Sequence, residues 1–390
     1  MRNTTLGFLS ERTITVGLAL LWLCIQSALY LRYGVRFMGD SEGYILYAQN
    51  IAERFHFEQS HQLKYFGYPL FMALLFKFGL GLKGVVLAQI IISGVATIAL
   101  YKTTRLLAGN WLAPALSTLL FIGWYEVQMY NTFILTESLY ISLFIFVFYF
   151  LARAKGNLRQ SLWALLVIFY ICIVRPNGFI ALVAYFGYIF TTFYIHIKSP
   201  LTRGALILAF SLVPVIAVVV VDQYLLTSFG AILDPYEKGH VIFMYEDLVV
   251  PSSGPILMPP ADASPLAKIS YFIQHNTSYF IRMAGLRFLL FWGNVKPFYS
   301  LLHNLIIVVV LYPLYFFTVR AIATNRIATS LSVFVVLLLL QQCFITTMTS
   351  EDWNGRFLMT LIAFVFIFGA IGLSWQLEKW RKKKPEQVEV

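Results

Sequence analysis

Hydrophobic residues along this chain form long runs that are separated by short polar stretches. A helix needs about 20 mostly apolar residues to cross the hydrocarbon core of a bilayer. The predicted spans are 14–32, 84–106, 111–131, 135–152, 159–175, 179–197, 204–224, 301–320, 327–348 and 357–377. The pattern therefore predicts an all-α polytopic membrane protein of about ten transmembrane helices, with interfacial helices in its first outer loop.

Two segments between the predicted spans are long, 33–83 and 225–300. Within the first, 41–54 has apolar residues at the i, i+3, i+4, i+7 spacing of an amphipathic helix. The stretch 69–80 is apolar but too short to cross a bilayer, which favours an interfacial or re-entrant helix. The second segment is rich in proline and predicts an irregular lid or specificity loop, followed by a helix at 281–292.

Basic residues indicate the orientation of the chain. Short cytoplasmic loops are enriched in Lys and Arg. Counted together with the span ends next to it, every short loop on the side of the N-terminus has at least two of them. Both termini are therefore predicted to be cytoplasmic, with 1–377 as one transmembrane domain and 378–390 as a basic tail. The expected location is a bacterial or archaeal cell membrane. Most acidic residues fall on the outer side, so the chemistry is expected there.

Composition excludes several classes of protein. The net charge is +11, but Lys and Arg are not gathered on a polar domain, so no nucleic-acid partner is expected. Charged residues make up 12% of the chain, against about 25% in soluble domains. The three cysteines lie inside apolar runs with no disulfide or zinc spacing. Motifs for zinc proteases, nucleotides and dinucleotides are absent, so neither a cofactor nor a metal is predicted.

Three acidic residues at the outer side are candidates for catalysis. Asp40 and Glu42 lie in Gly39-Asp40-Ser41-Glu42-Gly43-Tyr44, directly beyond the first span. A carboxylate there can accept a proton as a general base, or Asp40 can cap the following helix while Glu42 complements its dipole. Glu137 begins a span at the outer edge, where it either lines a site or only complements the helix dipole. Both interpretations stay open for each residue.

Two arginines at outer helix ends are candidates for binding phosphate. Arg175 precedes Pro176, and Arg356 precedes the last span. The planar guanidinium fork suits a phosphate, but Arg175 can equally be an interfacial anchor, and Arg356 can form an internal salt bridge. The residues that would line a site around them are Tyr44, Tyr68, Asn177, Glu351 and Asp352.

Several short motifs together resemble the GT-C class of membrane glycosyltransferases, which includes protein O-mannosyltransferases and lipid A aminoarabinose transferases. The motifs are Gly39-Asp40-Ser41-Glu42-Gly43-Tyr44, Gly67-Tyr68-Pro69-Leu70-Phe71, Leu135-Thr136-Glu137-Ser138-Leu139, Arg175-Pro176-Asn177-Gly178 and Asn354-Gly355-Arg356-Phe357. Their order and their outer-side placement carry the resemblance. Many members of the class have adjacent Asp-Glu where Ser41 separates Asp40 from Glu42. Many also carry a soluble C-terminal domain, which the hydropathy pattern of this sequence does not predict.

The resemblance implies an inverting enzyme that moves a sugar from a polyprenyl-phosphate donor to a lipid, glycan or protein acceptor on the outer face. It implies that Asp40 is the catalytic carboxylate, that Glu137 is a second acid and that Arg175 and Arg356 hold the donor phosphate. Two alternatives remain, a transporter or lipid flippase and a non-catalytic scaffold. Transporters concentrate ionisable residues near the bilayer midplane and often contain repeats, whereas neither feature is evident in this sequence.

Overall fold

The computed structural model describes residues 10–57, 61–154, 157–208, 210–211, 230–243, 245–252, 254–350 and 355–383. The chain divides into two compact units. Unit 1 comprises Met1–Leu182, Val310–Ser332 and Met359–Val390, and unit 2 comprises Val183–Val309 and Val333–Leu358. The regular secondary structure of the described residues is helical, with two isolated β-bridges beside it. The prediction of an all-α chain is confirmed.

Seven helical stretches in the described part of the chain are long and apolar enough to cross a membrane. They are α1 (Glu11–Tyr33), α4 (Gly81–Ala108), α7 (Glu137–Ala154), η3 with α9 (Pro176–His196), α14 to α15 (Leu301–Ala323), α16 (Thr329–Met348) and most of α18 (Ile362–Lys382). The chain is therefore a multi-pass membrane protein. Three shorter apolar helices accompany them, namely α3 (Gly67–Lys77), α5 (Leu112–Gly123) and α8 (Leu158–Val174).

The ten predicted spans correspond only in part to these helices. The predicted span 159–175 coincides with α8, which is one of the shorter helices. The predicted span 111–131 is interrupted, because Trp124 has an extended backbone (φ −81°, ψ 101°) between α5 and the short α6 (Tyr125–Met129). Most of the predicted span 204–224 lies outside the described residues.

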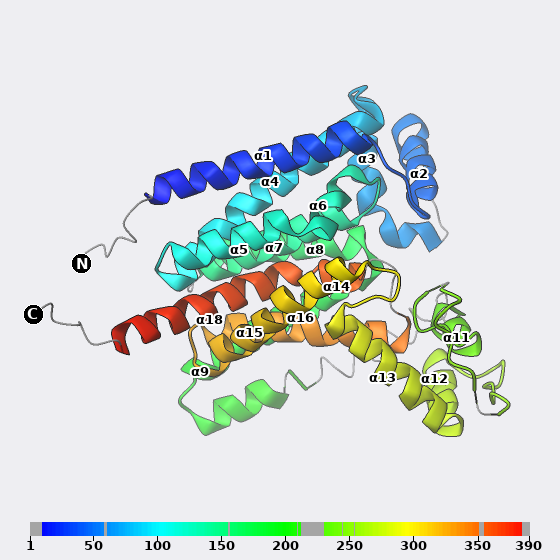
Figure 1. The fold of residues 1–390 in the computed structure, drawn as a ribbon. Helices are drawn as coiled ribbons and strands as arrows, with labels where there is room; N and C mark the ends of the chain where they lie inside the picture. The colour runs from blue at the N-terminus through cyan, green and yellow to red at the C-terminus, as the bar shows by residue number, and fades with distance from the viewer. Residues whose placement is uncertain are drawn as a thin grey trace, which may run out of the picture. The chain divides into compact units, whose positions relative to one another are not determined.

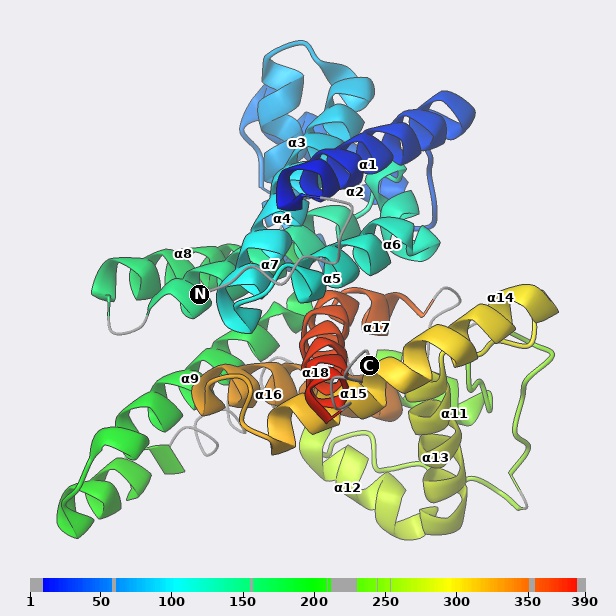
Figure 2. The same cartoon turned by 60° about the vertical axis from the view of Figure 1, so that its left-hand side comes forward.

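Unit 1 is built around α7, which is buried along most of its length. Helix α7 packs against both α4 and α8 (Figures 1 and 2). In contrast, α1 exposes most of its apolar surface, as expected of a helix that faces lipid. Because α7 and α8 are consecutive and connected by a short turn, the start of α7 and the end of α8 lie at the same end of the unit.

The segment 33–83, which is predicted to be the first outer loop, contains two helices that pack within unit 1. Helix α2 (Ser41–Arg54) has the predicted bounds and buries its apolar face. Helix α3 begins at Gly67, where a Cβ atom would collide with the backbone of Ile173 in α8. The Tyr170 hydroxyl donates to the Gly67 carbonyl oxygen at 3.1 Å. The glycine of the Gly67-Tyr68-Pro69 motif is therefore explained by the close approach of α3 to α8.

The predicted outer segment of unit 2 has a small hydrophobic core of its own. Helices α11 (Gly230–Glu237), α12 (Pro265–His275) and α13 (Thr277–Gly293) contribute to it, and α13 confirms the predicted helix at 281–292. The prolines at 251–260 lie in irregular backbone, as predicted, but α11 and α12 are helices in a segment that was predicted to be irregular, and Pro265 begins α12. The Asn276 side chain ties this backbone to the helices through hydrogen bonds with the N–H and carbonyl of Leu257, at 3.0 and 2.9 Å.

A buried arginine holds this outer segment in place. The Arg287 guanidinium donates to the His240 carbonyl at 2.8 Å and to the Thr347 carbonyl at 3.5 Å. It also stacks on the Tyr236 ring, 4.1 Å from the centroid. Burial lowers the pKa of Arg287, with Tyr236 opposing that shift. Arg287 therefore links the irregular segment after α11 to the end of α16.

Candidate active site

A buried ion pair lies at the end of unit 1 that is predicted to face outward. Arg175 Nη1 and Glu137 Oε1 are 2.7 Å apart, and their side chains are 4% and 1% exposed. The two residues are 38 positions apart in the sequence, but they flank the adjoining ends of α7 and α8. The structure thus joins a predicted site acid to a predicted phosphate ligand. Each partner makes the burial of the other possible, because either charge alone would be costly to bury.

The backbone after α8 explains why Arg175 points toward α7. Arg175 has an extended conformation (φ −144°, ψ 144°), as expected for a residue before proline. The turn η3 (Pro176–Gly178) then folds back so tightly that a Cβ on Gly178 would collide with the Ile171 carbonyl. The Arg175 guanidinium lies 5.2 Å from the centroid of the Tyr140 ring, one turn along α7 from Glu137.

A short backbone bridge brings the first outer loop to the same place. The Arg36 N–H donates to the Thr132 carbonyl at 2.9 Å, and the Ile134 N–H donates to the Arg36 carbonyl at 3.0 Å. The Arg36 guanidinium also stacks on Phe133, 4.1 Å from the ring centroid. These contacts fix the segment that leads to Asp40 beside the segment that leads to Glu137.

Tyr44 is buried in an aromatic cluster near Asp40 and the ion pair. Its side chain is buried and packs against the rings of Tyr65 and Tyr68, with centroids 5.6 and 5.4 Å away. Burial raises the pKa of the Tyr44 phenol, and the nearby Tyr65, Asp40 and Glu137 raise it further, while Arg175 opposes them. The Tyr44 phenol is therefore close enough to Asp40, Glu137 and Arg175 to interact electrostatically with each of them.

Asp40 and Glu42 are both exposed to solvent. Asp40 occupies the N-cap position of α2, but its side chain makes no capping hydrogen bond. The Ser41 hydroxyl instead bonds with the N–H and the carbonyl of Met38, both at 2.9 Å. Helix capping by the Asp40 carboxylate is therefore not observed, and the base interpretation remains.

A buried polar network near the start of α7 was not predicted from the sequence. The Asn131 side chain accepts from Ser138 at 2.6 Å and donates to Gln26 and Ser93, both at 3.1 Å. The Gln89 side chain accepts a hydrogen bond from the Tyr68 hydroxyl at 2.6 Å. It also donates to the backbone carbonyls of Asn131 and Phe133. Polar amide side chains inside apolar spans are costly to bury without partners. Their presence in the sequence was the signal that could have predicted this network. The network connects α1, α4 and the start of α7, which positions Glu137.

Tyr140 is a second residue that the sequence analysis missed. Its side chain is fully buried beside Arg175, and its hydroxyl has no hydrogen-bond partner among the described residues. A buried hydroxyl without a partner costs about 1–3 kcal/mol. The Tyr140 hydroxyl is therefore suited to bond with an oxygen of a bound ligand.

The remaining predicted residues are placed as follows. Asn177 is half-buried in η3, next to Arg175. Tyr68 is fully buried. Arg356 is half-buried at the start of α17 (Arg356–Met359), in unit 2, whereas Arg175 belongs to unit 1. Glu351 and Asp352 lie outside the described residues.

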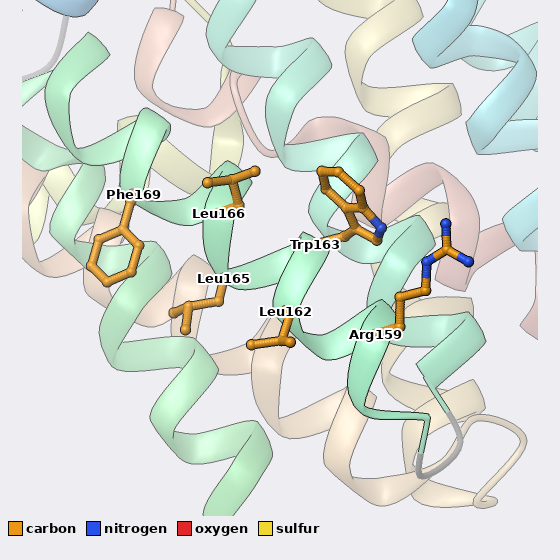
Figure 3. Close-up of a pocket in the computed structure, with 6 residues that line it drawn as sticks. All are labelled: Arg159, Leu162, Trp163, Leu165, Leu166 and Phe169. Atoms are coloured by element: carbon orange, nitrogen blue, oxygen red, sulfur yellow. The ribbon is translucent and has the colours of Figure 1, made fainter.

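A cavity of about 460 Å³ lies along α8, away from these groups. Its lining is Arg159, Leu162, Trp163, Leu165, Leu166 and Phe169. Figure 3 shows that all six side chains come from the same helix. Because Leu166 and Phe169 are more than half exposed, this is an open apolar furrow on the helix surface, of the kind that faces lipid. It contains no acid to pair with Arg159, so the candidate site remains the cluster around Glu137 and Arg175.

Metal-binding groups and similar proteins were both sought as further evidence about this site. In the described part of the chain, no three His, Cys, Asp or Glu side chains are grouped so that they could hold a metal ion. No protein-family model matches the sequence, and no curated protein matches it.

Proposed function

We propose that this membrane protein is a glycosyltransferase of the GT-C type, which moves a sugar from a polyprenyl-phosphate donor to an acceptor on the outer face of the membrane. The observation that carries the proposal is the meeting, within unit 1, of the buried Glu137–Arg175 pair with Tyr44 and the Asp40 segment. The proposed transfer requires a carboxylate that accepts the acceptor proton and a cation that stabilises the leaving phosphate.

In the proposed reaction, an acceptor hydroxyl or amine attacks C1 of the sugar. The new bond from C1 to the acceptor forms as the bond from C1 to the phosphate oxygen breaks. The bonding electron pair leaves with the polyprenyl phosphate, and the acceptor proton passes to Asp40. Attack opposite the leaving group inverts the configuration at C1.

Arg175 supplies the electrostatic stabilisation of the leaving phosphate. A guanidinium has five N–H donors in a rigid fork, so its bond to Glu137 does not exhaust its capacity for phosphate. Glu137 holds Arg175 in position and compensates its charge before the donor binds. The Tyr140 hydroxyl offers a further donor beside the same guanidinium.

The test is the release of polyprenyl phosphate from polyprenyl-phosphate sugars by the purified protein in nanodiscs. Arg175→Ala removes a charge-assisted hydrogen bond worth about 1.5–3 kcal/mol, so donor use is expected to fall tenfold to a hundredfold. Arg175→Lys keeps the charge but loses the fork and restores only part of the activity. Exposed Arg12→Ala is the control and leaves release unchanged.

Release that is equal in the wild type, in Arg175→Ala and in vesicles without protein would refute the proposal. Glycan and lipid profiling of a deletion strain then identifies the sugar, because the missing product accumulates only when the gene is present. Transport of an intact lipid-linked sugar, with no release of polyprenyl phosphate, would instead support a flippase.

A further inference from the structure

Three cations surround one indole ring at the far end of unit 1, which the sequence analysis assigns to the cytoplasm. Trp375 lies in α18 (Ile362–Lys383). The guanidinium carbons of Arg326 and Arg320 lie 4.2 and 5.4 Å from its ring centroid, and Lys379 Nζ lies 5.4 Å from it. No two of these charged groups can be further apart than twice 5.4 Å, because each lies within that distance of the same ring centroid.

Close helix packing places the first of these cations. Helices α15 (Tyr312–Ala323) and α18 lie side by side (Figures 1 and 2). Gly372 of α18 packs so closely that a Cβ atom would collide with the Phe317 carbonyl of α15. Arg320 and Trp375 each lie one turn beyond this contact, Arg320 on α15 and Trp375 on α18. The glycine contact therefore brings Arg320 to the indole.

The end of α15 places the second cation. Asn325 has a left-handed conformation (φ 49°). The N–H groups of Asn325 and Arg326 donate to the carbonyls of Ile322 and Ala321, both at 3.0 Å. This is the pattern of a Schellman cap, which turns the chain sharply after a helix. The cap fixes Arg326 over Trp375, so the cluster is formed before any ligand binds.

Among the described residues, no carboxylate forms an ion pair with the cluster. The ion pairs of the described residues involve other cations, namely Arg105, Arg175 and His240. Glu378, which directly precedes Lys379, instead accepts a hydrogen bond from Asn110 Nδ2 at 2.9 Å. The Arg320 Nε atom is buried without a hydrogen-bond partner in the described structure. Three like charges are thus held together, which favours binding of an anion.

We infer that this cluster binds the headgroup of an anionic phospholipid. The guanidinium groups match the phosphate oxygens of a phosphodiester. On α15, Phe316 and Val319 are 58% and 65% exposed, and they provide apolar surface for acyl chains next to the cations. Trp375 is a residue typical of the membrane interface. This combination suits a lipid better than a soluble phosphate, which would make no use of the apolar surface. The inference does not depend on the proposed enzymatic function.

The test uses the full-length protein in nanodiscs of phosphatidylcholine or of an equimolar mixture with phosphatidylglycerol. Bound phosphatidylglycerol is counted by native mass spectrometry, and the melting temperature is measured in both lipids. Each basic residue near a membrane surface contributes about 1 kcal/mol to binding, or about fivefold. Arg320→Gln with Arg326→Gln is therefore expected to weaken phosphatidylglycerol binding about 25-fold. Arg381→Gln removes an exposed charge from the same helix and is expected to leave binding unchanged.

Three results would overturn the inference. The first is wild-type affinity in the double variant, and the second is an equal loss in Arg381→Gln, which would show diffuse attraction. The third is measured on the wild type alone and has two forms. Either the wild type melts at the same temperature in both lipids, or inorganic phosphate raises its melting temperature as much as phosphatidylglycerol does. A higher melting temperature of the wild type with phosphatidylglycerol, and not with inorganic phosphate, supports the lipid site.

Discussion

The Glu137–Arg175 pair allows a quantitative test of unit 1. At 2.7 Å and an effective dielectric constant of about 20, the gross attraction is about 6 kcal/mol. Much of this offsets the desolvation of two side chains that are 1% and 4% exposed. Replacing one partner, as in Glu137→Gln or Arg175→Gln, leaves the other charge buried alone and is expected to cost about 3–5 kcal/mol.

Replacing both partners removes both buried charges, so the double variant is expected to be more stable than either single variant. Melting temperatures of the four proteins in one detergent measure this cycle, with exposed Arg153→Gln as a neutral control. Equal melting temperatures for all four proteins would show that the pair is not buried as described. Losses that simply add in the double variant would show that the two residues do not interact. The double variant, although folded, is expected to release little polyprenyl phosphate.

Three further predictions concern other parts of the chain. Arg287→Met is expected to make the segment 239–264 more sensitive to protease, because it removes the hydrogen bond to the His240 carbonyl. Exposed Arg282→Met on the same helix is the control, and equal cleavage of the two variants would contradict the role of Arg287. Gly178→Ala is expected to lower the melting temperature by the equivalent of about 1–3 kcal/mol, whereas Gly285→Ala, with open space around it, is not. In a background without native cysteines, an impermeant thiol reagent on intact cells is expected to label Ala261→Cys and not Ser199→Cys; the reverse would overturn the predicted orientation.

Local helices were predictable from the sequence. The spacing of apolar residues gave α2 its bounds, because burial of one face decides whether such a helix forms. The break at Trp124 was not predictable from hydropathy, which measures apolar content and not backbone direction. The predicted span 111–131 was therefore drawn as one helix where the structure has α5, α6 and η2 (Tyr130–Thr132).

The candidate site was predictable as a set of residues but not as a set of contacts. Glu137 and Arg175 could both be assigned to outer helix ends from the sequence. Their pairing depends on how α7 packs against α8 and on the turn at Gly178, which no local pattern encodes. The support from Asn131 and Gln89 depends on segments that are distant in the sequence, so it too required the structure.

The most direct test of the account is the turnover of Asp40→Asn compared with its binding of donor. The amide cannot accept the acceptor proton, and general-base catalysis typically contributes about 100- to 10,000-fold. Asp40 is exposed, so the variant is expected to fold, to bind a polyprenyl-phosphate sugar as the wild type does and to lose transfer by that factor. Glu42→Gln, two positions away, is expected to retain more activity. Normal transfer by Asp40→Asn would contradict the account.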